Sequence, residues 1–243
     1  MKIKIALFTF IIIILIPVGF VFYIQQDIKI MRSHYPYFNL KTKQYEWLEQ
    51  KPEEYKNLKE VSSNIKWAIV ISEDWAYFDH NGIDFNQLKI VLDEGLEEGK
   101  ITRGASTITQ QLVKNLFLSD ERTITRKLIE MLYAFILEKT YSKDFILERY
   151  LNIIELGNDI YGVEKASLHY FGKQSKDLNL KEACFIAVLL PSPIRYSQSY
   201  RDNELTEFMQ TQIDELLVKL RQAKIINRHD QLIMELTPIY FNH

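Results

Sequence analysis

The sequence is poor in the residues that build loop-rich or cross-linked folds. It has only eight glycines and six prolines in 243 residues, which argues against a disordered chain. It has one cysteine, Cys184, so no disulfide can form within the chain. This cysteine lies in an apolar run without a cationic neighbour to lower its pKa, which favours a buried, unreactive thiol over a nucleophile.

The sequence also lacks an excess of charge of either sign. Thirty Lys and Arg residues against 32 Asp and Glu residues leave a formal net charge of −2 at pH 7. The overall charge therefore gives no electrostatic reason to expect nucleic acid as a partner. Histidine is scarce too, and none of the other histidines lies at ligand spacing from His80, so a histidine metal site is not expected.

One long stretch has no charge at all. Residues 5–24 form an uncharged run behind Lys2 and Lys4. A helix of that length spans about 30 Å, the thickness of a bilayer core, so the run is predicted to be a retained transmembrane anchor. A cleaved signal peptide is the alternative, but its apolar region would be shorter and would end in small residues. The lysines predict a cytoplasmic N-terminus, with the rest of the chain outside the cytoplasm.

The remainder is predicted to be one domain of mainly α class. Residues 25–60 are interpreted as a juxtamembrane connector, whose aromatic side chains would either lie among lipid headgroups or pack on the domain. From residue 61 the apolar spacing is helical almost throughout, which predicts a domain over 61–222 that ends in a helix. A C-terminal tail over 223–243 follows. The length suffices for one core, and no repeat or second domain is evident.

Cap residues predict where several helices begin and end. Asp84, Ser106 and Ser142 are the expected N-caps, and Gly99 and Gly157 are the expected stops. Three further segments have helical or continuous apolar spacing and are expected to be helices: residues 124–135, 180–190 and 208–220. Residues 65–71 fit a short strand or a helix equally well.

A dense polar block suggests a site. The run Ser106-Thr107-Ile108-Thr109-Gln110-Gln111 follows the acidic pair Glu73-Asp74 along the chain. Polar clusters of this density are costly to bury, so a site is the better interpretation than a packed core. Glu73 comes directly after an apolar run, where partial desolvation would suit a general base or a general acid. Asp74 would point elsewhere on either a helix or a strand.

Cations gather at the other end of this stretch. Arg122, Arg126 and Glu130 are spaced four apart, so a continuous helix would place them on one face. Taken alone, this spacing is typical of a solvent-exposed face with ion pairs. Together with Lys114, Lys127 and a small-residue helix start at residues 104–106, it indicates a cradle for a diphosphate.

Within residues 61–200, five motifs resemble, in order, those of the peptidoglycan glycosyltransferases, glycosyltransferase family 51. The first is Glu73-Asp74-x-x-Tyr77-Phe78-x-His80-x-Gly82. The second is Gly104-x-Ser106-Thr107-x-Thr109-Gln110-Gln111-x-x-Lys114-Asn115, and the third is Arg126-Lys127-x-x-Glu130. The fourth is Ile146-Leu147-Glu148-x-Tyr150-Leu151-Asn152, continued by Gly157, Gly162 and Tyr170-Phe171-Gly172-Lys173. The fifth, Glu182-Ala183 through Pro191 and Pro193, is a loose match and is given no catalytic role. Tyr77 stands where the family usually has Phe.

The resemblance implies a lysozyme-like helical fold and polymerisation of lipid II into glycan strands. An acceptor hydroxyl would attack the donor's anomeric carbon with inversion, releasing undecaprenyl diphosphate. By this resemblance Glu73 is the general base and Glu130 acts near the departing diphosphate, where it positions cations or a divalent metal (Mg²⁺ or Mn²⁺). The residues expected to bind substrate are Ser106, Thr107, Gln110, Gln111, Lys114, Asn115, Arg122, Arg126 and Lys127.

The resemblance also implies a setting and partners. The expected location is the bacterial inner membrane, and the expected partners are lipid II, the growing glycan strand and other cell-wall synthesis proteins. No transpeptidase domain follows in the sequence, as in monofunctional members. A lysozyme-like peptidoglycan hydrolase is one alternative; it would have no need of the cation set. A membrane-anchored scaffold with a vestigial site is the other.

Overall fold

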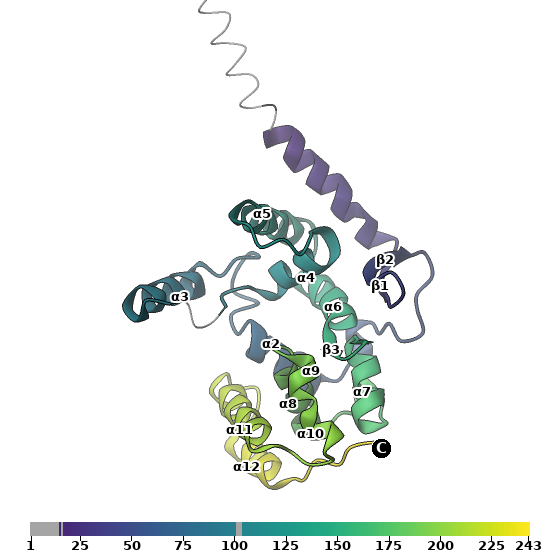
Figure 1. Cartoon of the computed structure of the whole chain (residues 1–243), viewed down its shortest axis with the longest axis vertical. Coiled ribbons are helices and arrows are strands. Elements are labelled where there is room, and N and C mark those ends of the chain that lie inside the picture. Colours follow the sequence, from purple (N-terminus) through teal and green to yellow (C-terminus); the bar gives the residue numbers. More distant parts are fainter. Residues whose placement is uncertain (1–14, 16, 101–103) are drawn as a thin grey trace, which may run out of the picture.

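The computed structural model describes residues 15, 17–100 and 104–243, and most of them are helical (Figure 1). The predicted mainly α class is therefore confirmed. After a helical segment at residues 17–27, the elements are, in chain order, η1 (Ile28–Arg32), β1 (Tyr35–Asn39), β2 (Gln44–Leu48), η2 (Leu58–Glu60), α2 (Ser63–Glu73), α3 (Phe85–Glu98), α4 (Ile108–Phe117), α5 (Ile124–Thr140), α6 (Lys143–Ile153), β3 (Glu155–Gly157), β4 (Ile160–Tyr161), α7 (Val163–Phe171), η3 (Ser175–Asp177), α8 (Leu180–Leu189), α9 (Pro193–Tyr196), α10 (Gln198–Arg201), α11 (Glu207–Gln222) and α12 (Arg228–Leu236).

Helix α8 lies at the centre of the fold. Every one of its residues is buried, as its almost entirely apolar sequence predicts. It packs against α2 and α11, and α7 and α12 cover other parts of it. Cys184 lies within this helix, and burial raises the pKa of its thiol. This agrees with the prediction of a buried, unreactive thiol.

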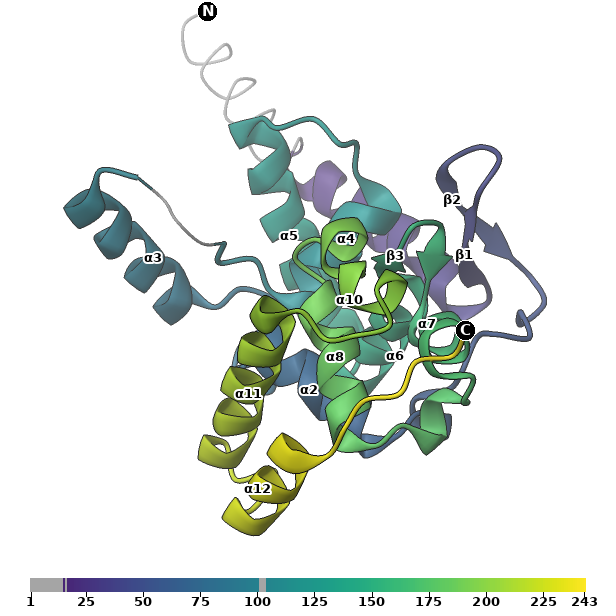
Figure 2. The same ribbon diagram turned by 60° about the horizontal axis from the view of Figure 1, so that its bottom comes forward.

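A second group of helices packs beside this core. Helix α4 contacts both α5 and α6, and buries Ile108, Leu112 and Val113 between them. Helix α3 is different, because Val91 is its only buried residue. Figures 1 and 2 show α3 standing away from the other helices.

Two short antiparallel hairpins complete the fold. Strand β1 pairs with β2 in the register Tyr35 to Leu48, and β3 pairs with β4. The first hairpin lies within residues 25–60, where no strand had been anticipated. It is joined to the domain by the Tyr45 hydroxyl, which donates to the Ile153 carbonyl at 2.8 Å. The aromatic residues of this segment therefore pack at least partly on the domain.

Most of the proposed membrane anchor lies outside the described residues, which begin at residue 15 and omit residue 16. Within the part that is described, no helix has both the length and the apolar character needed to cross a bilayer. The helical segment 17–27 is joined to α5 by the Tyr133 hydroxyl, which donates to the Asp27 carboxylate at 2.9 Å.

The cap predictions were correct at positions where contacts between neighbouring residues determine the helix boundary. Asp84 and Ser142 cap α3 and α6, and Gly99 ends α3 in the left-handed conformation at φ 70°. Two cap predictions were wrong. Thr107, not Ser106, caps α4, because its hydroxyl accepts from the Gln110 amide. The helix expected to stop at Gly157 already ends at Ile153.

The remaining helix predictions were close. Residues 65–71 are part of helix α2, not a strand, and the expected helices at 124–135, 180–190 and 208–220 correspond to α5, α8 and α11. Helix α12 was not foreseen; it lies in the segment interpreted as a tail.

Candidate active site

Two hollows adjoin at the start of α4. The larger one, the Glu73 cleft, has a volume of ≈ 660 Å³ and extends from the end of α2 to α11. The smaller one, the Glu130 cleft, has a volume of ≈ 300 Å³ and is lined by the start of α5 and the loop before it. Ser106 and Gln111 line both clefts. A substrate bound across the two clefts would therefore lie close to both Glu73 and Glu130.

Glu73 is the last residue of α2. The helix is fixed by its buried face, which includes Ile65 and Ile69, and this places the half-buried Glu73 carboxylate at the cleft. The side-chain amide of Gln111 donates to Glu73 Oε2 at 2.9 Å. Burial raises the pKa of Glu73, the hydrogen bond from Gln111 lowers it, and the nearby Asp74 carboxylate raises it; the net direction is upward.

Asp74 points away from this carboxylate, as predicted, and has a structural task. Its Oδ2 accepts from the backbone amide of Ile108, the first residue of α4, at 2.9 Å. Its Oδ1 lies 2.8 Å from His80 Nε2. A carboxylate at a helix N-terminus is stabilised by the helix dipole, so Asp74 fixes the end of α2 against the start of α4. This contact with Asp74 holds the His80 ring in place.

The start of α4 is closed by a capping box. The Thr107 hydroxyl accepts from the Gln110 amide, and the Gln110 side chain accepts from the Thr107 amide at 3.1 Å. The Thr107 hydroxyl also donates to the Gly82 carbonyl at 2.7 Å. Gly82 has a φ of 83°, and a Cβ there would lie 2.7 Å from the Ala134 carbonyl oxygen, so only glycine allows this close approach.

Cations surround the second carboxylate. Glu130 is 2% exposed, and its Oε2 accepts from Arg126 Nη1 at 2.7 Å. The ammonium group of Lys127 contacts the other oxygen, and also donates to Ser106 Oγ at 2.9 Å. The Nε of Arg126 is buried and has no hydrogen-bond partner among the described residues. A buried donor without a partner is costly, so this group is available for an anionic ligand in the Glu130 cleft.

The other predicted ligands lie at different positions. Lys114 and Arg122 are exposed and line the Glu130 cleft, whereas Asn115 lines neither cleft. The expectation that Arg122 shares a helix face with Arg126 was wrong, because Thr123 caps α5 and Arg122 precedes the helix. The loop before α5 still brings it to the same cleft.

Several lining residues were not found from the sequence. Lys219 and Gln222 of α11 and Gln87 of α3 reach the Glu73 cleft from distant parts of the chain. Tyr150 of α6 lies behind the cleft, where its hydroxyl donates to Gln111 Oε1 at 2.8 Å. Tyr150 belongs to the fourth motif, which was the one signal that could have found it.

The described residues show no preformed site for a divalent cation. They contain no group of three or more His, Cys, Asp or Glu side chains placed to hold a metal ion. Both oxygens of Glu130 already accept from cations. Hard divalent ions prefer several oxygen ligands. The other carboxylates that line this cleft, Asp120 and Glu121, belong to exposed residues before α5.

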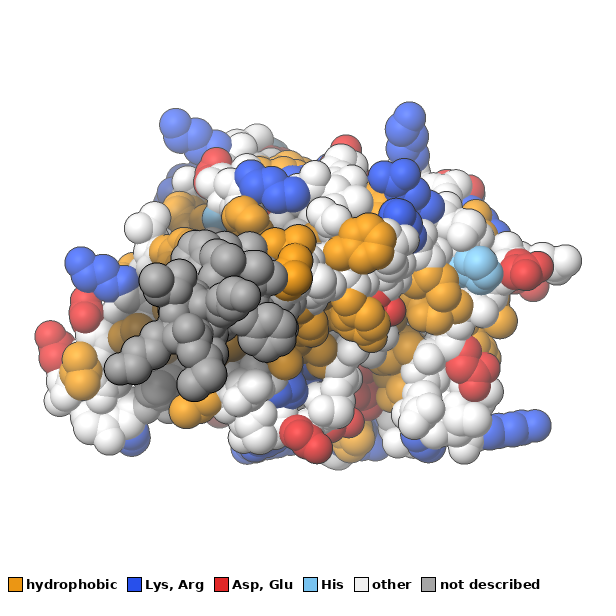
Figure 3. All heavy atoms as spheres, turned by 90° about the horizontal axis from the view of Figure 1, so that it is seen from above, with side chains coloured by type: hydrophobic (Ala, Val, Ile, Leu, Met, Phe, Trp, Pro, Cys, Tyr) orange, Lys and Arg blue, Asp and Glu red, His pale blue; other side chains and the backbone are white. Residues whose placement is uncertain are grey.

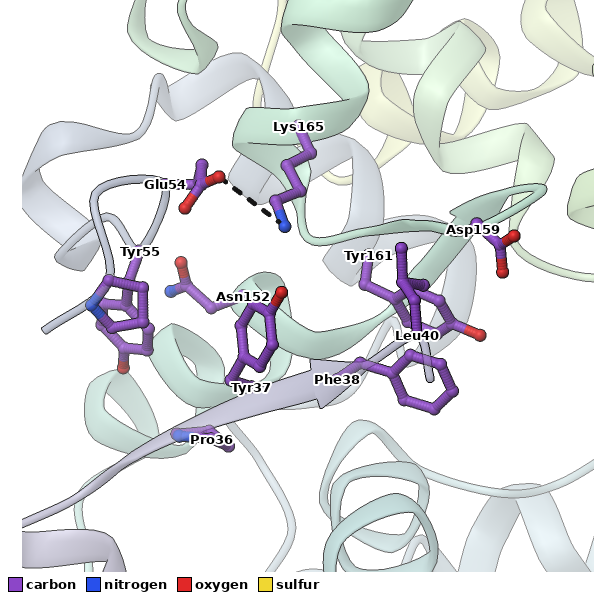
Figure 4. Close-up of a pocket in the computed structure, with 11 residues that line it drawn as sticks. Pro36, Tyr37, Phe38, Leu40, Glu54, Tyr55, Asn152, Asp159, Tyr161 and Lys165 are labelled. Carbon is purple, nitrogen blue, oxygen red and sulfur yellow. Dashed lines mark ion pairs between the residues drawn. The ribbon is translucent and has the colours of Figure 1, made fainter. Parts of the chain in front are cut away.

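A third hollow lies far from this chemistry, between β1 and α7 (Figure 4). Its volume is ≈ 30 Å³, too small for a sugar ring. Its charged groups are already paired: Lys165 lies 3.7 Å from Glu54, and Asp159 lies 2.6 Å from Lys43. The paired clefts at α4 are therefore the candidate active site.

Sequence comparison matches this chain to a protein family and to named relatives. The model of the family described as transglycosylase matches residues 41–220. A protein of Acinetobacter baumannii (strain SDF) named biosynthetic peptidoglycan transglycosylase is 39% identical over 155 residues, which are 64% of this chain and 68% of that protein. Proteins of the same name from Nitrosospira multiformis and Herminiimonas arsenicoxydans are 37% and 34% identical, over 68% and 84% of this chain and 70% and 81% of theirs. A solved structure of penicillin-binding protein 1A from Haemophilus influenzae matches 56% of this chain and 16% of that chain at 24% identity, with a TM-score of 0.34.

Proposed function

Because the chain belongs to the transglycosylase family, we propose that it polymerises lipid II into the glycan strands of peptidoglycan. One observation carries this proposal. A half-buried carboxylate without an ion pair among the described residues, Glu73, lies across α4 from a cluster of cations around Glu130. A glycosyl transfer that releases a diphosphate needs a base at one end and positive charge at the other.

In the proposed reaction the acceptor's sugar hydroxyl enters the Glu73 cleft. Glu73 takes the proton of this hydroxyl while the oxygen attacks the anomeric carbon of the donor. The bond from that carbon to the diphosphate oxygen breaks, and its electron pair leaves with the diphosphate. Attack from the face opposite the leaving group inverts the configuration.

The leaving diphosphate is proposed to occupy the Glu130 cleft. Arg126 Nε has no partner among the described residues, and Lys127 uses two of its three donors on Ser106 and Glu130. Lys114 and Arg122 add charge from the rim. Donors fixed before the reaction stabilise the charge that develops on the leaving oxygen without having to reorganise. Glu130 acts here by holding Arg126 and Lys127 in place.

The same geometry disfavours a hydrolase. A glycosidase of the two-carboxylate type needs one carboxylic acid that protonates the leaving oxygen. Glu73, whose pKa is raised by burial, would be the acid in such an enzyme, and Glu130 would have to act as its second carboxylate. Both oxygens of Glu130 are paired with cations, so this carboxylate is not free to activate a water molecule or to attack the sugar. A diphosphate leaves as an anion and needs no such proton.

The substrate's lipid tail suggests a membrane location, with the catalytic domain outside the cytoplasm. Exposed apolar side chains support this location. They occur on residues 17–27, where Val18, Phe22 and Tyr23 are all more than half exposed, and on α5, where Ile124 and Leu128 are. Figure 3 shows exposed hydrophobic side chains on the face seen from above. The anchor over residues 5–24 is part of this proposal.

The decisive experiment is incubation of the purified protein with lipid II, followed by separation of the products. Polymeric glycan and undecaprenyl diphosphate are expected, and finished peptidoglycan should remain uncut. Arg126→Ala should slow polymerisation by about 10²–10³-fold, the cost of losing one preorganised electrostatic contact. Cleavage of finished strands, at a rate unchanged in Arg126→Ala, would instead establish a hydrolase. Addition of EDTA tests whether the rate depends on a divalent ion.

A further inference from the structure

A buried tyrosine stands behind the proposed base. Tyr150 is fully buried in α6, between Leu147 and Leu151 of the same helix, which are also fully buried. Helix α6 packs against α4, and this contact brings the Tyr150 hydroxyl within 2.8 Å of Gln111 Oε1. Gln111 in turn donates to Glu73 Oε2 at 2.9 Å. Tyr150, Gln111 and Glu73 thus form one chain of hydrogen bonds across three helices.

The buried Tyr150 hydroxyl sets the direction in which these hydrogen bonds are donated. An amide side chain has one acceptor oxygen and one donor NH₂ group, so it faces an ionised carboxylate favourably in only one of its two orientations. The Tyr150 hydroxyl, as a donor, occupies the amide oxygen and turns the NH₂ group toward Glu73. Burial and the nearby carboxylates of Glu73 and Asp74 hold the pKa of Tyr150 well above its ordinary value, so the hydroxyl keeps its proton.

We propose that Tyr150 is a positioning residue, which orients the Gln111 amide so that it donates to Glu73 and keeps the base ionised and ready to accept a proton. Tyr150 does not touch the substrate in this proposal, since its side chain lies behind Gln111. The inference rests on the proposed role of Glu73 as the base. It goes beyond that role by naming the group that prepares it.

The other charged groups around Glu73 do not depend on Tyr150. The titratable side chains that line the same cleft are Asp74, Asp84 and Lys219, which come from the end of α2, the start of α3 and from α11. Asp74 is fixed by Ile108 and His80, and Asp84 caps α3. Removing the Tyr150 hydroxyl therefore changes one contact of the base and leaves the surrounding charges in place.

The test is Tyr150→Phe in the full chain, with Tyr170→Phe as the matched control. Tyr170 is also buried, and its hydroxyl also donates one hydrogen bond, to the Leu156 carbonyl at 2.7 Å, away from both clefts. The measurement is kcat/KM for lipid II against pH, because its acid limb reports the base in the free enzyme. Tyr150→Phe should move this limb upward by about half a unit to one unit, as expected when a hydrogen bond to a charged group is weakened. At high pH the activity should return to within about threefold of wild type, and Tyr170→Phe should not move the limb.

Two results would overturn the inference. One is an acid limb at the wild-type position in Tyr150→Phe. The other is a uniform loss of activity at every pH, which would mean that the hydroxyl matters only for packing. If Tyr150→Phe does not fold, Gln111→Met tests the same contact and must shift the limb at least as far. If both fold, the double variant should shift the limb no further than Gln111→Met alone, and additive shifts would contradict the relay.

A second readout separates this inference from the proposed function. Infrared difference spectra against Glu73→Gln report protonation of the Glu73 carboxyl without any substrate. The titration of that carboxyl should move upward in Tyr150→Phe and stay in place in Tyr170→Phe. If the wild-type protein does not polymerise lipid II, the proposed function fails while this titration still decides the relay.

Discussion

Replacing Lys127 by Met should damage catalysis far more than stability. The substitution keeps most of the aliphatic stem and removes the ammonium group, which contacts Glu130 and donates to Ser106. If that group also meets the leaving diphosphate, its loss should lower kcat/KM by about 10²–10³-fold, equivalent to about 2.7–4 kcal/mol of transition-state stabilisation.

The stability cost should be much smaller. The Lys127 side chain is 40% exposed, so its ion pair is screened by solvent, and Glu130 keeps its hydrogen bond from Arg126 at 2.7 Å. About 1 kcal/mol or less is expected, measured by urea unfolding.

The chain contains a close match for this ion pair outside the site. Lys173 lies 2.6 Å from Glu182, with side-chain exposures of 44% and 5%, against 40% and 3% for Lys127 and Glu130. Glu182 also keeps a second contact, from the Asn179 amide at 2.9 Å. Lys173→Met should therefore cost a similar free energy of unfolding and change the polymerisation rate by less than about threefold. Equal rates for the two variants would refute the assignment of Lys127 to the leaving group.

Four further outcomes are expected. Glu73→Gln should fold normally and lose at least about 10²-fold in polymerisation rate, since the amide cannot take a proton; substantial turnover would remove Glu73 from the role of base. Because burial raises the pKa of Glu73 and the base must be ionised, wild-type kcat/KM should fall as the pH drops through a value above 4.5, and an acid limb at or below 4.5 would contradict this. Gly82→Ala should lower the free energy of unfolding by about 1–3 kcal/mol, because its φ is 83° and its Cβ would meet the Ala134 carbonyl, whereas Gly104→Ala, with open space around it, should change it by less than about 0.5 kcal/mol. Deleting residues 1–16 should weaken action on lipid II in bilayers and leave action in detergent unchanged, and equal activity on bilayers would refute the anchoring role.

Local chemistry explains what the sequence by itself determined. The continuous apolar run at 180–190 specified a buried helix, and Asp84, Gly99 and Ser142 specified helix boundaries, because caps and periodicity act between residues close in the chain. The motifs identified the family and named both carboxylates and most of the cations that line the two clefts. The catalytic and binding roles of these residues stay predictions.

Tertiary structure decided the rest, because it depends on contacts between residues far apart in the chain. Neighbouring residues Ser106 and Thr107 are both good caps, and the contact of Thr107 with Gly82, 25 residues away, shows how a distant group favours one of them. The link from Tyr150 to Gln111 spans 39 residues and exists only because α6 packs on α4. The approach of Lys219 to the Glu73 cleft likewise requires α11 to pack against α2. No local pattern encodes such distances, so the residues that surround and orient the proposed base emerge only once the helices are packed.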